Sequence, residues 1–294
     1  MATQEQKTVA FVLYPGLTLL DLVGPLQVFA SLRRFSDQYR PVVVAERLEP
    51  MPTDGPLTVT AGQTFADVPD PAVVIVPGGD APTIKAMGDP AIREYLRQAA
   101  DTAPVVGSVC TGALVLAAAG LLEGRQATTH WAYHRLLERL GATYLPQRWV
   151  EDGKFITSAG VSAGIDMALT LVARLTDEPT ARRVQLSIEY DPHPPFGGID
   201  WDQVNRDIYE PIRVPSAQRA HHPYIAVALL MQFSTFRQAI ARPGKGEVDV
   251  GSLVSSHRPG RCRACRSRDR VADRPRRVPW SSADWVAQAI RARS

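Results

Sequence analysis

The chain has 294 residues, enough for one large α/β domain with an appendage or for two small domains. Hydrophobic residues make up 45% of it, an ordinary globular composition, and no uninterrupted apolar run reaches the roughly 18 residues that a membrane helix needs. The N-terminal sequence lacks the pattern of a secretory signal peptide, and the three cysteines cannot all be paired in disulfides. We therefore expect a soluble, cytoplasmic protein with no membrane partner.

The net charge of +3 hides an asymmetry along the chain. Residues 242–294 contain 13 Lys and Arg against 5 Asp and Glu, a net charge of +8, whereas residues 1–241 contain 20 against 25, a net charge of −5. The basic segment is rich in Arg, Pro and Ser and has little periodic apolar content. These features predict an α/β domain at 1–241 and a poorly ordered, largely irregular tail at 242–294. The domain has no basic face, so we expect no specific nucleic-acid partner.

Strand and helix patterns alternate along the domain. Short runs of apolar, β-branched residues predict buried strands at 7–13, 39–45, 72–76 and 105–109, with further short strands at 126–129, 148–151 and 155–158. Helical patterns fall at 17–32, interrupted at Gly24-Pro25, and at 91–100, 113–122, 132–140, 164–175 and 178–187. This alternation predicts a doubly wound, mostly parallel sheet, in which ligand sites form at the carboxyl ends of the strands.

The first candidate site residue is Asp21, which lies between Leu20 and Leu22 in the first helical pattern. An acid in apolar surroundings is desolvated, so its pKa should rise unless a cation lies nearby. The alternative is a solvated or capping aspartate, because Gly24-Pro25 is a plausible helix start.

The second candidate is the pair Gly78 and Gly79, which follows the strand at 72–76. Adjacent glycines let the backbone approach a ligand closely and present N–H groups to it. The signal is weak when taken alone.

The third candidate is Cys110, at the joint between the strand at 105–109 and the alanine-rich helix that follows. The N-terminus of a helix favours a thiolate over a thiol, so this position is suited to a nucleophile. The alternative is an inert cysteine packed as a small hydrophobe. Asp21, the glycine pair and Cys110 all follow the ends of predicted strands, so we expect them to meet at one edge of the sheet.

Four stretches of the sequence resemble the ThiJ/PfpI superfamily, which has a glutamine-amidotransferase-like (flavodoxin-like) sandwich with a nucleophile elbow. They are YPGLTLLDLVGP from Tyr14, VIVPGG from Val74, VGSVCTGALVLAAAGLLEGRQATTHW from Val106 and ITSAGVSAGIDMALTLVARL from Ile156. The resemblance spans about residues 7–236 and is greatest to isocyanide hydratases and to the N-terminal domains of some AraC-type regulators. It implies a homodimer that acts on a small molecule without a metal or an organic cofactor.

The resemblance also assigns roles to residues. Cys110 matches the nucleophilic cysteine of the elbow, Asp21 the acidic residue that faces it, and Thr111 the neighbour whose hydroxyl and N–H line the pocket. Gly78 and Gly79 match the backbone donors that cradle developing negative charge. Many proteases and glyoxalase-like members of the superfamily carry histidine directly after the cysteine, and Thr111 at that place argues against peptidase activity.

The function implied by the resemblance is cysteine-dependent hydration of an isocyanide to an N-substituted formamide through a covalent thioimidate. Two alternatives stay open: a non-catalytic small-molecule-sensing domain related to AraC-type regulators, and glyoxalase or stress-type chemistry at the same cysteine. His130 is a further catalytic candidate, although a histidine at a helix start is more often a cap or a packing residue. In the tail, His257, Cys262 and Cys265 have partial zinc spacing without a second ligand pair nearby.

Overall fold

The computed structural model describes residues 6–204. The predicted tail at 242–294, its possible zinc ligands and the last part of the predicted domain lie outside the described residues. In the described part, no helix is long and apolar enough to cross a membrane.

A seven-stranded sheet forms the centre of the described domain, in the order β10-β11-β7-β6-β1-β2-β5. All neighbouring strands in it are parallel except β10 and β11, which pair as an antiparallel hairpin. The strands are β1 (Lys7–Val12), β2 (Tyr39–Ala45), β5 (Gln63–Thr64), β6 (Val73–Val76), β7 (Val105–Val109), β10 (Trp149–Asp152) and β11 (Phe155–Ser158). The predicted doubly wound α/β fold is therefore confirmed.

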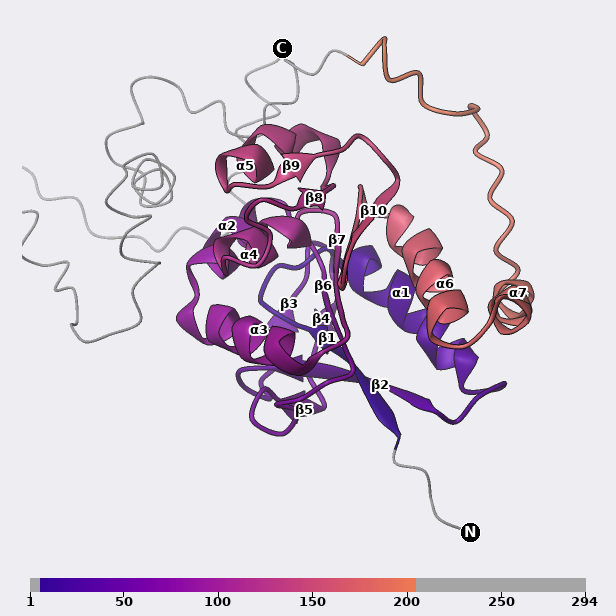
Figure 1. Cartoon of the computed structure of the whole chain (residues 1–294), viewed down its shortest axis with the longest axis horizontal. Coiled ribbons are helices and arrows are strands. Elements are labelled where there is room, and N and C mark those ends of the chain that lie inside the picture. Colours follow the sequence, from indigo (N-terminus) through magenta and orange to yellow (C-terminus); the bar gives the residue numbers. More distant parts are fainter. Residues whose placement is uncertain (1–5, 205–294) are drawn as a thin grey trace, which may run out of the picture. The chain divides into compact units, whose positions relative to one another are not determined.

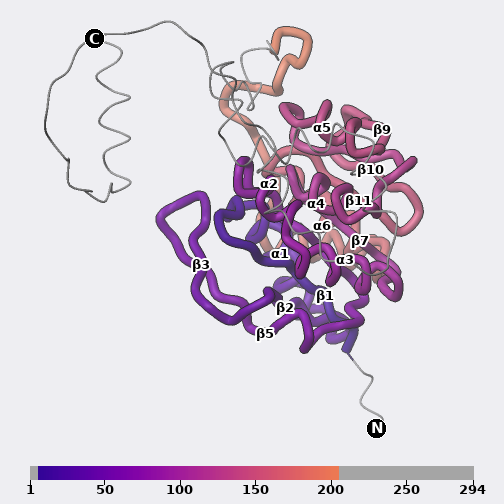
Figure 2. Tube along the Cα trace, turned by 90° about the vertical axis from the view of Figure 1, so that its left-hand side faces the viewer, coloured from indigo at the N-terminus to yellow at the C-terminus, as the bar shows by residue number. Residues whose placement is uncertain are grey.

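Helices cover both faces of this sheet (Figure 1). One face carries α1 (Leu19–Leu32), α6 (Ala163–Leu175) and α7 (Glu178–Ser187), and the other carries α2 (Ala81–Gly88), α3 (Pro90–Thr102) and α4 (Gly112–Ala118). The remaining elements are β3 (Met51–Pro52), β4 (Thr58–Val59), β8 (Gln126–Ala127), β9 (Thr143–Tyr144), a 3₁₀ turn at Trp131–Tyr133 and α5 (His134–Arg139). Figure 2 shows the connection that contains β3 projecting beyond the sheet.

The first helix runs without a break through Gly24 and Pro25, where the sequence predicts an interruption. Close packing against α6 is the physical reason. A Cβ on Gly24 would lie 3.0 Å from Cγ1 of Ile165, and a Cβ on Gly164 would lie 3.5 Å from Cδ of Pro25. These small residues allow α1 and α6 to approach closely, so tertiary contacts outweigh the local helix-breaking tendency of the Gly-Pro pair.

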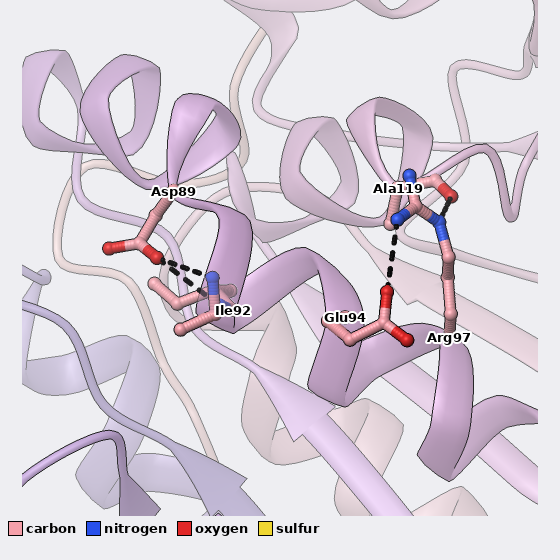
Figure 3. Close-up of polar contacts among 6 residues, drawn as sticks. Asp89, Ile92, Glu94, Arg97 and Ala119 are labelled. Carbon is pink, nitrogen blue, oxygen red and sulfur yellow. Dashed lines mark hydrogen bonds and ion pairs between the residues drawn. The ribbon is translucent and has the colours of Figure 1, made fainter. Parts of the chain in front are cut away.

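The helix after the elbow ends at Ala118, four residues before the predicted end. Gly120 adopts a left-handed conformation with φ of 83°, which ends the helix. The Arg97 Nε donates a hydrogen bond of 3.0 Å to the carbonyl of Ala119, and Glu94 contacts the same guanidinium (Figure 3). Asp89 caps the other end of the same α3 helix by accepting the N–H of Ala91 and Ile92. Helix α3 thus contacts α4 just beyond its last turn.

Gly112, the first residue of α4, has no room for a side chain. A Cβ there would lie 2.1 Å from the carbonyl oxygen of Val76 and 2.9 Å from that of Pro77. We expect Gly112→Ala to lower the free energy of unfolding by on the order of 3 kcal/mol, because the backbone of the β6–α2 connection must move. Denaturant unfolding measures the loss. The control is Gly88→Ala in α2, whose Cβ would meet nothing within 4 Å, and a loss of similar size there would contradict the steric explanation.

Candidate active site

The cysteine of the predicted elbow lies on a strained turn between β7 and α4. Cys110 has a φ of 56°, a left-handed conformation that L-residues with a side chain rarely adopt. Its N–H donates to the carbonyls of Ser158 (3.1 Å) and Ala159 (3.0 Å), and its carbonyl accepts the hydroxyl of Thr129 at 2.9 Å. These contacts hold the backbone in the strained conformation that a nucleophile elbow requires.

Asp21 in the first turn of α1 faces this cysteine. Its side chain is completely buried, and its Oδ2 accepts the N–H of Gly78 at 3.0 Å. The Cys110 thiol interacts with this carboxyl group, whose Oδ1 is buried without a hydrogen-bond partner among residues 6–204. Burial raises the pKa of Asp21 to about 7, an effect that the Gly78 N–H only partly offsets. The predicted direction of the pKa shift is therefore confirmed, and the alternative of a solvated aspartate is wrong.

The ionisation of Cys110 differs from the prediction. Burial and then the negative charge of Asp21 raise the pKa of the thiol, and the N–H groups of Val161 and Thr111 lower it by less. The side chain is only 5% exposed, so the cost of desolvating a thiolate outweighs the favourable helix N-terminus. The predicted direction of the Cys110 pKa shift is wrong for this reason. The pKa values of both groups are raised, that of Asp21 to about 7.

The two glycines lie beside this pair, but their N–H groups are already used. Gly78 donates to Asp21, and Gly79 donates to the hydroxyl of Thr111 at 3.0 Å. A Cβ on Gly78 would lie 2.6 Å from Oγ1 of Thr111 and 2.7 Å from Oδ2 of Asp21, so only glycine fits here. In this structure the glycines orient Asp21 and Thr111, and the N–H groups directed at the sulfur are those of Thr111 and Val161.

A buried chain of hydroxyl groups extends from Thr111 away from the sulfur. Oγ1 of Thr111 lies 2.8 Å from Oγ1 of Thr83, which lies 3.2 Å from the hydroxyl of Tyr14. The Tyr14 hydroxyl donates to the carbonyl of Pro77 at 2.8 Å. Thr83 belongs to α2, a helix that the sequence analysis missed. Tyr14 is the first residue of the Tyr14-Pro15-Gly16 motif, and its place in that motif is the sequence feature that could have indicated a part in the site.

His130 acts as a cap. Its Nδ1 accepts the N–H of Ala132 at 3.3 Å, and its ring packs near Trp131 and Tyr133. Burial lowers the pKa of His130 and favours the neutral ring. The ring also lies close enough to Gly160 that a Cβ there would be 3.0 Å from its Cδ2. His130 therefore packs against the turn that contains Val161. It is not one of the groups that act on the Cys110 thiol.

Among residues 6–204, no three His, Cys, Asp or Glu side chains are grouped in a way that could hold a metal ion. Cys110 is a free thiol. The groups that the fold brings together at the carboxyl edge of the sheet are thus a thiol, a buried carboxyl group, two backbone donors and a hydroxyl. They can perform nucleophilic addition with proton transfer.

A parallel sheet with a cysteine on a strained strand-to-helix turn, opposite a buried carboxyl group, defines an α/β protein of the nucleophile-elbow class. The chain belongs to the DJ-1/PfpI family, whose sequence pattern matches residues 7–174. The resemblance to the ThiJ/PfpI superfamily drawn from the sequence is confirmed.

Individual relatives point in two directions. An isonitrile hydratase from Pseudomonas putida is 45% identical over 188 residues, which are 64% of this chain and 80% of that protein. The HTH-type transcriptional regulator CdhR from Pseudomonas aeruginosa is 31% identical over 169 residues, 56% of this chain and 49% of the regulator. The crystal structure of a ThiJ/PfpI family protein from Pseudomonas syringae matches with a TM-score of 0.63 and 34% identity, covering 81% of this chain and 91% of that chain.

Proposed function

We propose that this chain is an isocyanide hydratase, a lyase that adds water to an isocyanide and releases an N-substituted formamide. The observation that carries the proposal is the buried Asp21 carboxyl within reach of the Cys110 thiol, with threonine where peptidases of the superfamily have histidine. The similarity to an isonitrile hydratase supports the same reaction. Cys110 serves as nucleophile and Asp21 as the group that moves protons.

The first half of the reaction joins the sulfur to the substrate. The Asp21 carboxylate takes the thiol proton while the Cys110 sulfur bonds to the terminal carbon of R–N≡C. Asp21 then returns the proton to that carbon, which leaves a neutral thioimidate, R–N=CH–S–Cys110. A carboxyl group with a pKa of about 7 suits both transfers, because neither its acid nor its base form is scarce at neutral pH. The N–H groups of Thr111 and Val161 stabilise the sulfur as it carries negative charge.

The second half consumes water. Asp21 takes a proton from water as the water oxygen bonds to the thioimidate carbon, and the imine nitrogen receives that proton. The resulting R–NH–CH(OH)–S–Cys110 loses its C–S bond while the hydroxyl proton passes to the sulfur. The products are R–NH–CHO and the free thiol. Isocyanide and water together supply all the atoms of the formamide, so the reaction as written uses no metal or organic cofactor. Thr111, held by Gly79, orients the adduct.

Incubation of the purified protein with an aryl isocyanide tests the proposal. We expect formamide to accumulate, with one oxygen from the solvent when the reaction runs in ¹⁸O-labelled water. Mass spectrometry of the quenched enzyme should show a transient adduct on the peptide that contains Cys110. Absence of formamide above the buffer rate would contradict the proposal, and consumption of methylglyoxal by the same protein would favour glyoxalase chemistry instead.

A sensing function is the second candidate, because the chain is similar to about half of the regulator CdhR. A sensor would bind the isocyanide without turnover. Calorimetric binding together with absence of formamide would identify that case.

We also propose a homodimeric, cytoplasmic protein with its catalytic domain at 1–241 and a separate basic tail at 242–294. Light scattering of the full chain tests the homodimer. Formamide production by a variant that ends at residue 241 tests the division into domain and tail. A monomer, or a truncated protein that folds but lacks activity, would contradict them.

A further inference from the structure

The turn at residues 159–162, between β11 and α6, supplies one of the two N–H groups directed at the Cys110 sulfur, that of Val161. The other donor, Thr111, belongs to the elbow itself. The position of the Val161 N–H relative to the sulfur therefore depends on what holds this turn. Its first residue, Ala159, accepts the N–H of Cys110 at 3.0 Å and donates its own N–H to the carbonyl of Arg148 at 2.9 Å.

The side chain of Arg148 holds the other end of the turn. Its Nε lies 2.6 Å and its Nη2 2.5 Å from Oδ2 of Asp166, in the first turn of α6. The same Nη2 donates to Oγ of Ser162 at 3.4 Å, although Ser162 makes no side-chain cap of its own helix. Tyr190 adds a hydroxyl donor to Oδ2 of Asp166 at 3.1 Å. Arg148 thus touches the first residue of the turn through its backbone and the last residue through its guanidinium.

We propose that Arg148 and Asp166 are positioning residues that keep the Val161 N–H directed at the Cys110 sulfur. The inference rests on the proposed use of Cys110 as nucleophile. Neither side chain is placed in contact with the sulfur, so both act through the backbone of the 159–162 turn. The side chain of Asp166 is 23% exposed and that of Arg148 48%, so the restraint on the turn comes from the several contacts that the guanidinium makes rather than from burial of the ion pair.

The chain contains a matched control pair. Arg174, in the last turn of α6, contacts Glu151 of β10 at 3.3 Å. Arg148 directly precedes β10, so both ion pairs connect α6 with this edge of the sheet. Only the Arg148 pair lies at the 159–162 turn. A general loss of packing between α6 and the sheet would affect both pairs alike, whereas a positioning effect on Val161 would appear for Arg148 alone.

The test is the rate at which iodoacetamide alkylates Cys110 in the full chain, measured from pH 6 to 10 by mass spectrometry of its peptide. Arg148→Gln should shift the profile to higher pH and slow alkylation at pH 8 by about 3- to 10-fold, because a donor to the thiolate is displaced. Asp166→Asn should give the same shift, Arg148→Lys a smaller one, and Arg174→Gln none. The other titratable groups near the sulfur, Asp21 and Tyr14, are unchanged in all four variants.

An unshifted profile in both Arg148→Gln and Asp166→Asn would overturn the proposal, and so would an equal shift in Arg174→Gln. If Arg148→Gln fails to fold, Asp166→Asn and Arg148→Lys decide the question. Because alkylation needs no isocyanide, the result is independent of the hydratase assay. Formamide production with an unshifted profile would refute the positioning role alone, and a shifted profile without formamide production would refute the proposed reaction alone.

Discussion

Cys110→Ala should reduce the turnover of an aryl isocyanide by at least about 10³-fold, because alanine offers no lone pair to the isocyanide carbon. The fold should survive. The backbone bonds that hold residue 110 in its left-handed conformation involve Ser158, Ala159 and Thr129, and none of them uses the sulfur.

Formamide production under substrate saturation measures the loss, with circular dichroism and thermal unfolding as checks on the fold. Cys262→Ala and Cys265→Ala are the matched controls, and both should keep full activity. Cys110→Ser should resemble the alanine variant, because a hydroxyl is far harder to ionise than a thiol. Retention of more than a tenth of the turnover in Cys110→Ala would exclude the covalent mechanism.

Asp21→Asn should have two opposite effects. Turnover should fall by about 10²- to 10⁴-fold, because the amide neither takes the thiol proton nor delivers it to carbon. Stability at neutral and higher pH should rise, because the variant no longer buries a charge there. The amide oxygen can still accept the Gly78 N–H, so the local structure should be preserved.

The sign of the stability change follows from the raised pKa. The folded protein holds the Asp21 proton up to about pH 7, whereas the unfolded chain releases it near the ordinary value of 3.8. Stability from this group is therefore complete below about pH 4 and is lost as the pH rises to about 7, by up to roughly 4 kcal/mol. Urea unfolding of the wild type and of Asp21→Asn at pH 5, 6, 7 and 8 should show a growing advantage of the variant. Asp101→Asn, at an exposed position, should show none.

The same pKa predicts how activity depends on pH. Because the first step needs Asp21 as a carboxylate, kcat/KM should rise with pH below about 7 and level off above it. A rate that instead falls across this range would indicate that the protonated acid and a thiolate are the active forms, and the order of the two proton transfers would have to be reversed.

Sequence reasoning identified the charged and reactive part of the site. Cys110 and Asp21 could be placed at one edge of the sheet because both follow a strand and the strands are parallel. The direction of the Asp21 pKa shift followed from its apolar neighbours along the helix. The ionisation of Cys110 could not be inferred in the same way, because it depends on how deeply the elbow is buried and on the distance to a carboxylate from another segment.

Val161 and Thr83 could not be predicted from the sequence, for a different reason. Val161 contributes a backbone N–H, which every residue except proline has, so its side chain carries no signal. Thr83 lies in α2, where Pro82 and Gly88 obscure the helical pattern. The continuous α1 helix was also missed, because the packing of Gly24 and Pro25 against α6 is a tertiary effect.

The buried hydroxyl chain has a fixed polarity. The single proton of the Tyr14 hydroxyl is committed to the carbonyl of Pro77, so Thr83 must donate to Tyr14 and Thr111 must donate to Thr83. The Thr111 oxygen is therefore left with lone pairs, one of which receives the Gly79 N–H. The hydroxyl proton of Thr111 is thus committed inside the chain, so its oxygen can accept a hydrogen bond from a bound molecule but cannot donate one.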